Sequence, residues 1–244
     1  AHTGWWTCVA TCDIDGDGDQ DLLAGNFGLN TKYHVDSEHP ATLFAADFGG
    51  DGQLQLVEAQ HKEGKLLPVR GRSCSTSAMP HLIERAPSYT SFASKTLQEL
   101  YTPSALDSAH RLEATTLAST LFRNDGSGRF VAEALPVLSQ LAPVMAIALG
   151  DFDGDGRPEA ALAQNFNAAQ RETGRMNAGL GVIVEPQANG AGLVELWPAQ
   201  SGFSGRFDPR AMVASDLDGD GREDLLLGQN DGAAVIFRSV APAE

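Results

Sequence analysis

The chain has 244 residues and a formal net charge of −15, with 42% hydrophobic and 20% charged residues. This length and composition fit a folded protein of one or two domains, and all-β architectures of this size often form a single domain. The acidic balance excludes the basic surface of a nucleic-acid-binding protein. No apolar run approaches the ~18 residues of a membrane-spanning helix.

The first predicted strand runs from Thr7 to Cys12, close to the beginning of the chain. Because the sequence begins Ala-His-Thr-Gly without a targeting segment, we expect a fragment of a longer chain. Cys8 and Cys12 would lie about 13 Å apart in an extended strand, too far for a disulfide, so we expect them to be buried small hydrophobes. With Cys74 the cysteine count is odd, which argues against a disulfide framework.

Four nine-residue acidic stretches repeat along the chain, at 13–21, 47–55, 151–159 and 216–224. All but the second follow the pattern Asp-x-Asp-Gly-Asp-Gly-x-x-Asp/Glu. Short apolar runs flank them, at residues 7–12, 22–26, 145–150, 160–165, 211–215 and 225–230. Their length favours strands over helices, and their apolar character on both faces predicts inner strands packed between sheets. The predicted repeating unit is strand, Asp-rich loop, strand.

The segments between these units contain hairpin and helix signals. Hairpins are predicted at 121–131 and 182–196, around turn residues such as Asn-Asp-Gly. The third and fourth loops begin 65 residues apart (216 − 151), the span of one four-stranded propeller blade. The first two begin only 34 apart (47 − 13), so we expect the second loop in the outer hairpin of the first blade.

Residues 72–110 differ from the rest and predict short helices at 80–85, 91–101 and 103–109. Ser91 and Ser94 are candidate N-caps, and Pro103 suits a first helical turn. This helical insertion is expected to cover a blade edge, with a partner-binding lid as the alternative. The predicted organisation is therefore propeller blades at 1–71, a helical insertion at 72–110 and further blades at 111–244.

The spacing of acids within the loops suits calcium, which takes 6–8 oxygen ligands. Asp at loop positions 1, 3 and 5 points carboxylates inward, Gly at position 6 allows the chain to turn back, and position 7 offers its carbonyl. An acid at position 9 closes the site. About three Ca²⁺ ions are predicted. Their expected site residues are Asp13, Asp15, Asp17, Asp19, Asp21, Asp151, Asp153, Asp155, Arg157, Glu159, Asp216, Asp218, Asp220, Arg222 and Asp224.

Other metals and another calcium motif fit the loops less well. The loop at 47–55 has Gly49 and Gln55 where two carboxylates are needed, so we expect it to be metal-free or weak. An EF-hand requires Glu at position 12, where this chain has Ala24, Leu162 or Leu227. Magnesium rarely takes an all-protein cage, and zinc and copper prefer nitrogen or sulfur ligands.

The loop between two apolar strands resembles the FG-GAP/VCBS repeat, which also occurs in the propellers of integrin α-subunits. The stretches 4–6, 25–31 and 124–128 are similar to bacterial VCBS-repeat proteins related to the ASPIC/UnbV group. This resemblance implies an all-β β-propeller, often seven-bladed, that is exported or surface-attached, with the loop Asp residues as calcium ligands. About four blades fit in 244 residues, which suggests part of a larger ring, although a small closed ring is an alternative.

Three functions follow from these expectations. The first is a non-enzymatic, calcium-stabilised module that binds a protein or glycan in an extracellular, periplasmic or cell-surface setting, without a membrane-spanning segment or nucleic acid. The second is a catalytic or accessory domain of an exported enzyme acting on polysaccharide, but no Gly-x-Ser-x-Gly or His-Glu-x-x-His signature is present and no catalytic residue is predicted. The third is a lectin-like propeller that uses Trp5, Trp6 or Trp197, although each tryptophan also suits blade packing.

Overall fold

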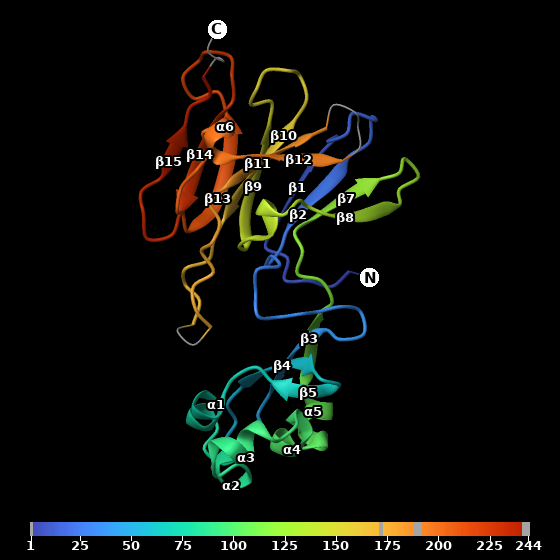
Figure 1. The fold of residues 1–244 in the computed structure, drawn as a ribbon, viewed down its shortest axis with the longest axis vertical. Coiled ribbons are helices and arrows are strands. Elements are labelled where there is room, and N and C mark those ends of the chain that lie inside the picture. The colour runs from blue at the N-terminus through green and yellow to red at the C-terminus, as the bar shows by residue number, and fades with distance from the viewer. Residues whose placement is uncertain (1, 171–172, 188–191, 241–244) are drawn as a thin grey trace. The chain divides into compact units, whose positions relative to one another are not determined.

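The computed structural model describes residues 2–170, 173–187 and 192–240 (Figure 1). The described chain is mostly β, with small antiparallel sheets and a short helical region. It forms two compact units. Residues 2–4 and Lys32–Thr116 make the smaller unit, and Trp5–Thr31 with residues 117–240 make the larger one.

The larger unit contains three sheets in the described residues, each formed by antiparallel neighbours. The first has the order β1 (Cys8–Cys12), β2 (Asp21–Gly25), β7 (Thr120–Asn124), β8 (Phe130–Ala134). The second has the order β12 (Leu193–Leu196), β11 (Val182–Pro186), β10 (Glu159–Gln164), β9 (Val144–Gly150), and the third has β13 (Pro209–Ser215), β14 (Asp224–Gln229), β15 (Val235–Phe237). Two short helical segments, η1 (Leu138–Gln140) and α6 (Pro198–Ser201), lie outside the sheets. Both predicted hairpins are present, as β7–β8 and β11–β12.

The sheets of the larger unit pack face to face through their apolar strands. Strand β9 packs next to both β1 and β13, so the first strands of successive sheets are neighbours (Figure 1). Strand β10 is buried along its whole length. Its side chains alternate between two cores, since Ala160 and Leu162 join one cluster while Ala161 and Ala163 join another. This arrangement is expected of propeller blades.

The inner-strand prediction holds fully for β10 but only in part for β1 and β13, the first strands of their sheets. In β1 exposed residues alternate with half-buried ones, and in β13 the same alternation follows the buried Pro209 and the exposed Arg210. Cys8 and Cys12 are accordingly half-buried rather than fully buried, and the three cysteines form no disulfide within the part of the chain that is described. This agrees with the expectation that Cys8 and Cys12, about 13 Å apart along one extended strand, are too distant for a disulfide.

The smaller unit is built on a sheet with the order β5 (Lys65–Pro68), β4 (Gln55–Lys62), β3 (Ala41–Ala46), β6 (His110–Ala114). Short helices follow β5 along the chain: α1 (Arg72–Ala78), α2 (Leu82–Arg85), α3 (Tyr89–Ala93), α4 (Leu97–Tyr101) and α5 (Pro103–Ser108). They bury Leu82, Leu97 and Leu100 against Phe44 and Val57 of the sheet. The helices therefore supply most of a separate hydrophobic core.

The caps of these helices differ in part from the sequence prediction. Ser88, not Ser91, caps α3, because the Ser88 hydroxyl accepts a hydrogen bond from the Ser91 N–H at 3.1 Å. Thr96, not Ser94, caps α4, where the Glu99 carboxylate accepts a hydrogen bond from the Thr96 N–H at 2.7 Å. Pro103 begins α5 as predicted.

The position of the second loop corrects a prediction. The loop at 47–55 does not lie in an outer hairpin of the first blade, since it joins β3 to β4 in the sheet of the smaller unit. The outer strands of the first sheet are β7 and β8, which follow the insertion. The boundaries of the compact units, near 31/32 and 116/117, therefore differ from the expected ones at 71/72 and 110/111.

Among the described residues, the structure has no helix of the length and hydrophobicity needed to span a membrane.

Candidate metal centres

The four loops share one backbone conformation, and their first residue organises it. Each loop joins two paired antiparallel strands. The carboxylate of the Asp at position 1 accepts hydrogen bonds from the N–H groups of positions 4 and 6, at distances between 2.6 and 3.0 Å. This pattern is present for Asp13, Asp47, Asp151 and Asp216. The loop is thus curled by its own side chain.

Two glycines, not one, allow this curl. The sequence pattern singled out position 6, but positions 4 and 6 both have positive φ in every loop, for example +82° at Gly154 and +87° at Gly156. L-residues with a side chain rarely adopt this region, which explains the repeated Gly-x-Gly spacing.

The side chain at position 9, at the start of the next strand, holds the beginning of the loop by a hydrogen bond. It accepts a hydrogen bond from the N–H of position 2 in all four loops, at 2.7 to 3.2 Å. Asp21, Glu159 and Asp224 are buried, with exposed fractions of 0%, 3% and 1%. A buried carboxylate is costly unless hydrogen bonds or a cation compensate its charge.

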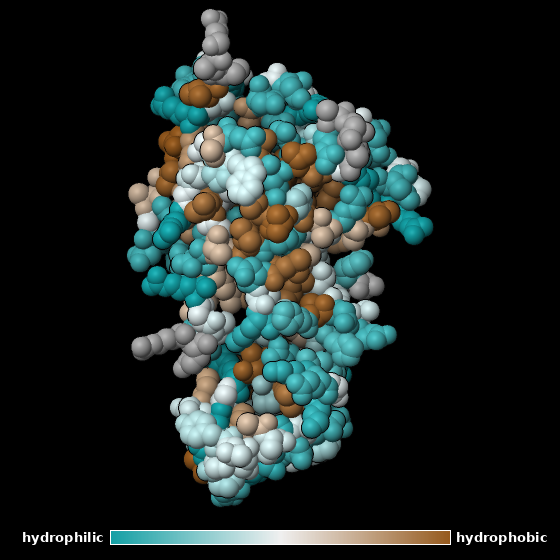
Figure 2. Space-filling model, in the orientation of Figure 1, coloured by the Kyte–Doolittle hydropathy of each residue, from teal (hydrophilic) through white to brown (hydrophobic). Residues whose placement is uncertain are grey.

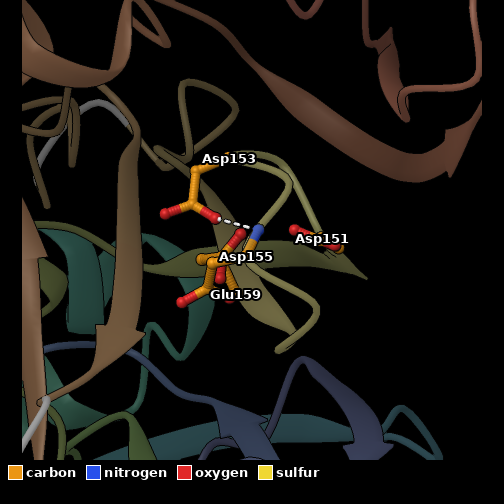
Figure 3. Close-up of side chains that lie close together, drawn as sticks. All are labelled: Asp151, Asp153, Asp155 and Glu159. Carbon is orange, nitrogen blue, oxygen red and sulfur yellow. Dashed lines mark hydrogen bonds between the residues drawn. The ribbon is translucent and has the colours of Figure 1, made fainter. Parts of the chain in front are cut away.

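Three acidic clusters result among the described residues, each with carboxylate oxygens within 4.8 Å of one another. The loop at 151–159 brings four groups together, from Asp151, Asp153, Asp155 and Glu159, and Figure 3 shows these side chains around the loop. The other two clusters contain Asp13, Asp15 and Asp17, and Asp216, Asp218 and Asp224. An all-oxygen, multiply charged donor set of this kind suits a hard cation such as calcium.

Some predicted site residues lie outside these clusters. Asp21 and Asp220 do not join the carboxylates of their loops. Asp19, Arg157 and Arg222 occupy position 7, which was predicted to offer only its backbone carbonyl. Their N–H groups donate to the carboxylate at position 5, at 2.8 to 3.0 Å.

The pKa of Asp216, at position 1, shifts in the opposite direction to the pKa values of Asp21 and Glu159, at position 9. At position 1, backbone N–H groups lower the pKa of Asp216, led by the N–H of Gly221. At position 9, burial raises the pKa of Asp21, and it raises the pKa of Glu159 to about 7. Neighbouring Asp153 and Asp151 add to the shift at Glu159. Asp21 and Glu159 are therefore buried carboxylates whose negative charge a bound cation would stabilise.

Arginine side chains that the sequence pattern did not identify contact the predicted ligands. Arg123 on β7 contacts the Asp15 carboxylate, and Arg238, just after β15, contacts Asp218 at 3.2 Å. Within the loops, Arg157 contacts Asp155 at 3.0 Å, and Arg222 contacts Asp220. Arg123 lies on the third strand of its sheet and Arg238 directly follows one, and only strand pairing reveals that these residues lie beside the loops.

The loop at 47–55 has the same backbone but a different donor set. Gln55 replaces the position-9 acid, and its amide oxygen accepts from the N–H of Phe48 at 2.7 Å. Gly49 contributes no side chain at position 3. This loop forms no acidic cluster among the described residues.

The tryptophans considered as sugar-binding candidates have different surroundings. The Trp5 ring lies 4.7 Å from the Phe27 ring and the Trp6 ring 5.5 Å from the Phe122 ring, centroid to centroid, so each packs against another aromatic ring. Trp197 is 61% exposed. Among the histidines, His39 contacts Asp36 at 3.2 Å and its ring lies 5.3 Å from that of His61.

Comparison with known proteins identifies one part of the chain. The family model of an FG-GAP-like repeat matches residues 113–162, which run from the end of β6 through β7, β8 and β9 into β10. The match includes the loop with four converging carboxylates. A search of curated proteins found no significant match. Residues 113–162 are an FG-GAP-like repeat, which confirms the resemblance drawn from the sequence.

Proposed function

We propose that this chain is a calcium-binding, FG-GAP-type propeller module that binds a protein or glycan outside the cell without catalysing a reaction. The observation that carries the proposal is the convergence of carboxylates in three loops of one conformation, one of them inside the FG-GAP-like repeat. The proposal includes a part-propeller in which further blades complete a larger ring.

The residues present fit calcium by the chemistry of the donor set. Asp at positions 1, 3 and 5 and the acid at position 9 offer oxygen ligands alone, together with the position-7 carbonyl. In the loop at 151–159, the buried Glu159 has a raised pKa and accepts one hydrogen bond among the described residues, from the N–H of Phe152. A bound cation would balance the negative charge of this buried carboxylate.

The role of the ion in this proposal is structural. It would connect the loop, through positions 1 to 7, to the first residue of the following strand at position 9. Binding free energy of this kind stabilises the folded state directly, because the unfolded chain has no assembled site. Sites of modest affinity fill in millimolar calcium, which supports an extracellular, periplasmic or cell-surface location.

The non-enzymatic reading rests on how the acidic groups are used. The loop carboxylates either hold backbone N–H groups or converge as ligands, so they are explained without a catalytic acid or base. A polysaccharide-active enzyme or its accessory domain remains the second function, to be tested by incubating the protein with polysaccharides and measuring released reducing ends.

A lectin-like function is favoured by one residue only. Trp197 is exposed immediately before α6, whereas Trp5 and Trp6 pack against other rings. An exposed indole suits stacking on a sugar face. On the face shown in Figure 2, hydrophobic residues of the larger unit lie among hydrophilic ones. Loss of glycan binding in Trp197→Ala, with an unchanged thermal melt, would support this alternative over a protein ligand.

The test of the calcium proposal is a thermal melt with calcium, with magnesium and with chelator. We expect Tm to rise by several degrees in millimolar calcium alone, and the rise to be lost in the triple variant Asp15→Asn, Asp153→Asn, Asp218→Asn. Position 3 is chosen because its side chain accepts at most one of the loop N–H groups, whereas position 1 accepts those of positions 4 and 6. Asp51→Asn in the loop at 47–55 is the matched control. Equal melts in all three conditions, with no calcium found by elemental analysis, would refute the proposal.

A further inference from the structure

The three acidic loops differ in what the third strand of each sheet places beside them. The residue at loop position 10 pairs with a third-strand residue: Leu22 with Phe122, Ala160 with Val184, and Leu225 with Phe237. The next residues along the third strands, which we call the flanking pair, are therefore equivalent in the three sheets. The flanking pairs are Arg123-Asn124, Glu185-Pro186 and Arg238-Ser239.

The first residue of the flanking pair is positively charged in two sheets and negatively charged in the third. Arg123 contacts the position-3 carboxylate of Asp15, and Arg238 contacts that of Asp218 at 3.2 Å. The equivalent residue beside the loop at 151–159 is Glu185. It lines one cavity of about 570 Å³ together with Asp153 and Glu159, and Arg222 and Arg238 line the same cavity. A fixed positive charge competes with a cation for the first two sites, whereas a further negative charge attracts one to the third.

The second residue of the flanking pair determines how many carboxylate oxygens of the position-9 acid accept no backbone hydrogen bond. The N–H of Asn124 donates to Asp21 Oδ1 at 2.8 Å, and the N–H of Ser239 donates to Asp224 Oδ1 at 2.9 Å. Since the other oxygen of each Asp accepts from the position-2 N–H, both oxygens are already used. Pro186 has no N–H, so only one oxygen of Glu159 is held by the backbone.

These two differences agree with the clusters. In the loop at 151–159 the position-9 acid joins three Asp carboxylates among the described residues, whereas Asp224 joins only two and Asp21 stays outside its cluster. The position-7 arginines do not explain the difference between the last two loops. Arg157 and Arg222 make the same contact with the position-5 Asp in each.

We propose that the loop at 151–159 is the tightest of the three cation sites, and that the flanking pair sets this order. Glu185 and Pro186 strengthen the site beside them, whereas Arg123 and Arg238 weaken theirs. The inference rests on the proposed calcium function and deepens it, because it assigns affinity to residues outside the Asp-rich loops.

The test is calcium titration by calorimetry on the full chain, with the calcium-free protein as the starting material. In the wild type, Asp153→Asn should remove the tightest binding event, whereas Asp15→Asn and Asp218→Asn should leave it. Glu185→Arg should weaken that event by about tenfold or more, because it reverses a charge beside the site. Arg238→Gln should change affinity in the opposite direction, tightening the event that Asp218→Asn removes.

Glu84→Arg is the matched control, because it makes the same change of charge at an exposed residue of the smaller unit. This variant should leave the order of calcium affinities among the three sites unchanged. Circular dichroism establishes that each variant is folded, and Glu185→Gln replaces Glu185→Arg if the latter is not. Persistence of the tightest event in Asp153→Asn, or unchanged affinities in both Glu185 variants and Arg238→Gln, would overturn the inference alone. An absence of calcium binding in the wild type would refute the proposed function as well.

Discussion

Glu223 belongs to the loop at 216–224, yet its carboxylate accepts a hydrogen bond from the backbone N–H of Asp151 at 3.0 Å. It thereby holds the first residue of the neighbouring acidic loop. Gly150 makes this approach possible, since a Cβ at that residue would collide with the Glu223 carboxylate. Two candidate cation sites of successive sheets are thus joined by one hydrogen bond.

Removing this hydrogen bond should affect the loop that Glu223 does not belong to. Glu223→Ala leaves the Asp151 N–H without its acceptor, and we expect a loss of about 1 kcal/mol in the free energy of unfolding. Calcium affinity at the 151–159 loop should fall as well, because Asp151 is its first residue. Urea unfolding and calorimetry measure the two effects. Glu84→Ala is the control, and equal stability of both variants would show that the contact contributes nothing.

If the three acidic clusters bind calcium as proposed, we expect that substitutions can convert the loop at 47–55 into a fourth site. It already has the curled backbone, and it lacks only the acids at positions 3 and 9. We expect Gly49→Asp with Gln55→Glu to raise the number of calcium ions bound per chain by one. A Cβ at Gly49 would lie 3.3 Å from the flexible Gln55 amide, so the substitution is sterically feasible.

Calorimetric stoichiometry with and without the pair of substitutions measures this gain. Gln53→Asp is the control, because it adds an acid to the same loop at position 7, where the side chain is not expected to be a ligand. A gain of one ion in the control would mean that charge, rather than ligand position, decides binding.

The equivalent glycines Gly25 and Gly228, at the fifth residues of β2 and β14, should respond differently to a methyl group. A Cβ at Gly25 would lie 2.5 Å from the Cys8 sulfur and 2.7 Å from the Val144 carbonyl oxygen. The nearest atom to a Cβ at Gly228 is the Ala211 carbonyl oxygen at 3.7 Å. Gly25→Ala should therefore lose about 1–3 kcal/mol of stability, whereas Gly228→Ala should be near neutral or slightly stabilising. Chemical denaturation in excess calcium compares them, and similar losses would contradict the packing at Gly25.

The stability of the calcium-free protein should depend on pH through the ionisation of Glu159. Burial raises the pKa of this carboxyl from 4.5 to about 7 in the folded state. Between these values the unfolded chain is ionised while the folded chain keeps the proton. This contribution to stability is therefore complete below pH 4.5 and is lost as pH rises to about 7.

Denaturation of the chelated protein between pH 4.5 and 8 measures this loss. Glu159→Gln should show a shallower fall in stability with pH than the wild type. Gln55→Glu, which places a carboxyl at the same loop position in the smaller unit, should introduce an additional fall of its own. Parallel curves for the wild type and Glu159→Gln would show that Glu159 ionises normally in the folded protein.

The sequence predicted well those features that depend on residues close together in the chain. The Asp-rich loops are nine residues long, and their strands follow at once, so spacing alone identified β1–β2, β9–β10 and β13–β14 and the carboxylates that converge in them. What it missed depends on distant pairing. Arg123 and Arg238 approach Asp15 and Asp218 only because third strands pair with second strands, a relationship that the loop pattern does not contain.

The second loop was misplaced for a related reason. Its distance of 34 residues from the first loop fits either an outer hairpin or a new sheet, and only the apolar residues of the helices decide between them. Leu82, Leu97 and Leu100 need a partner surface, and β3 and β4 provide it. The helix caps were shifted by a few residues because Ser and Thr are frequent throughout 88–96, so composition alone did not identify the capping residue.

The pairing of β2 with β7 has a consequence for the order in which the protein folds. Leu22 is opposite Phe122, so a hundred residues (122 − 22) separate two adjacent strands. All of β3 to β6 and the five short helices are synthesised in that interval, and their contacts are closer in sequence. Closing the longer loop costs more chain entropy and contacts of high sequence separation form more slowly. During translation, β2 would therefore keep an unpaired edge while the smaller unit folds, and the first acidic loop would meet Arg123 only after the ribosome has added the insertion.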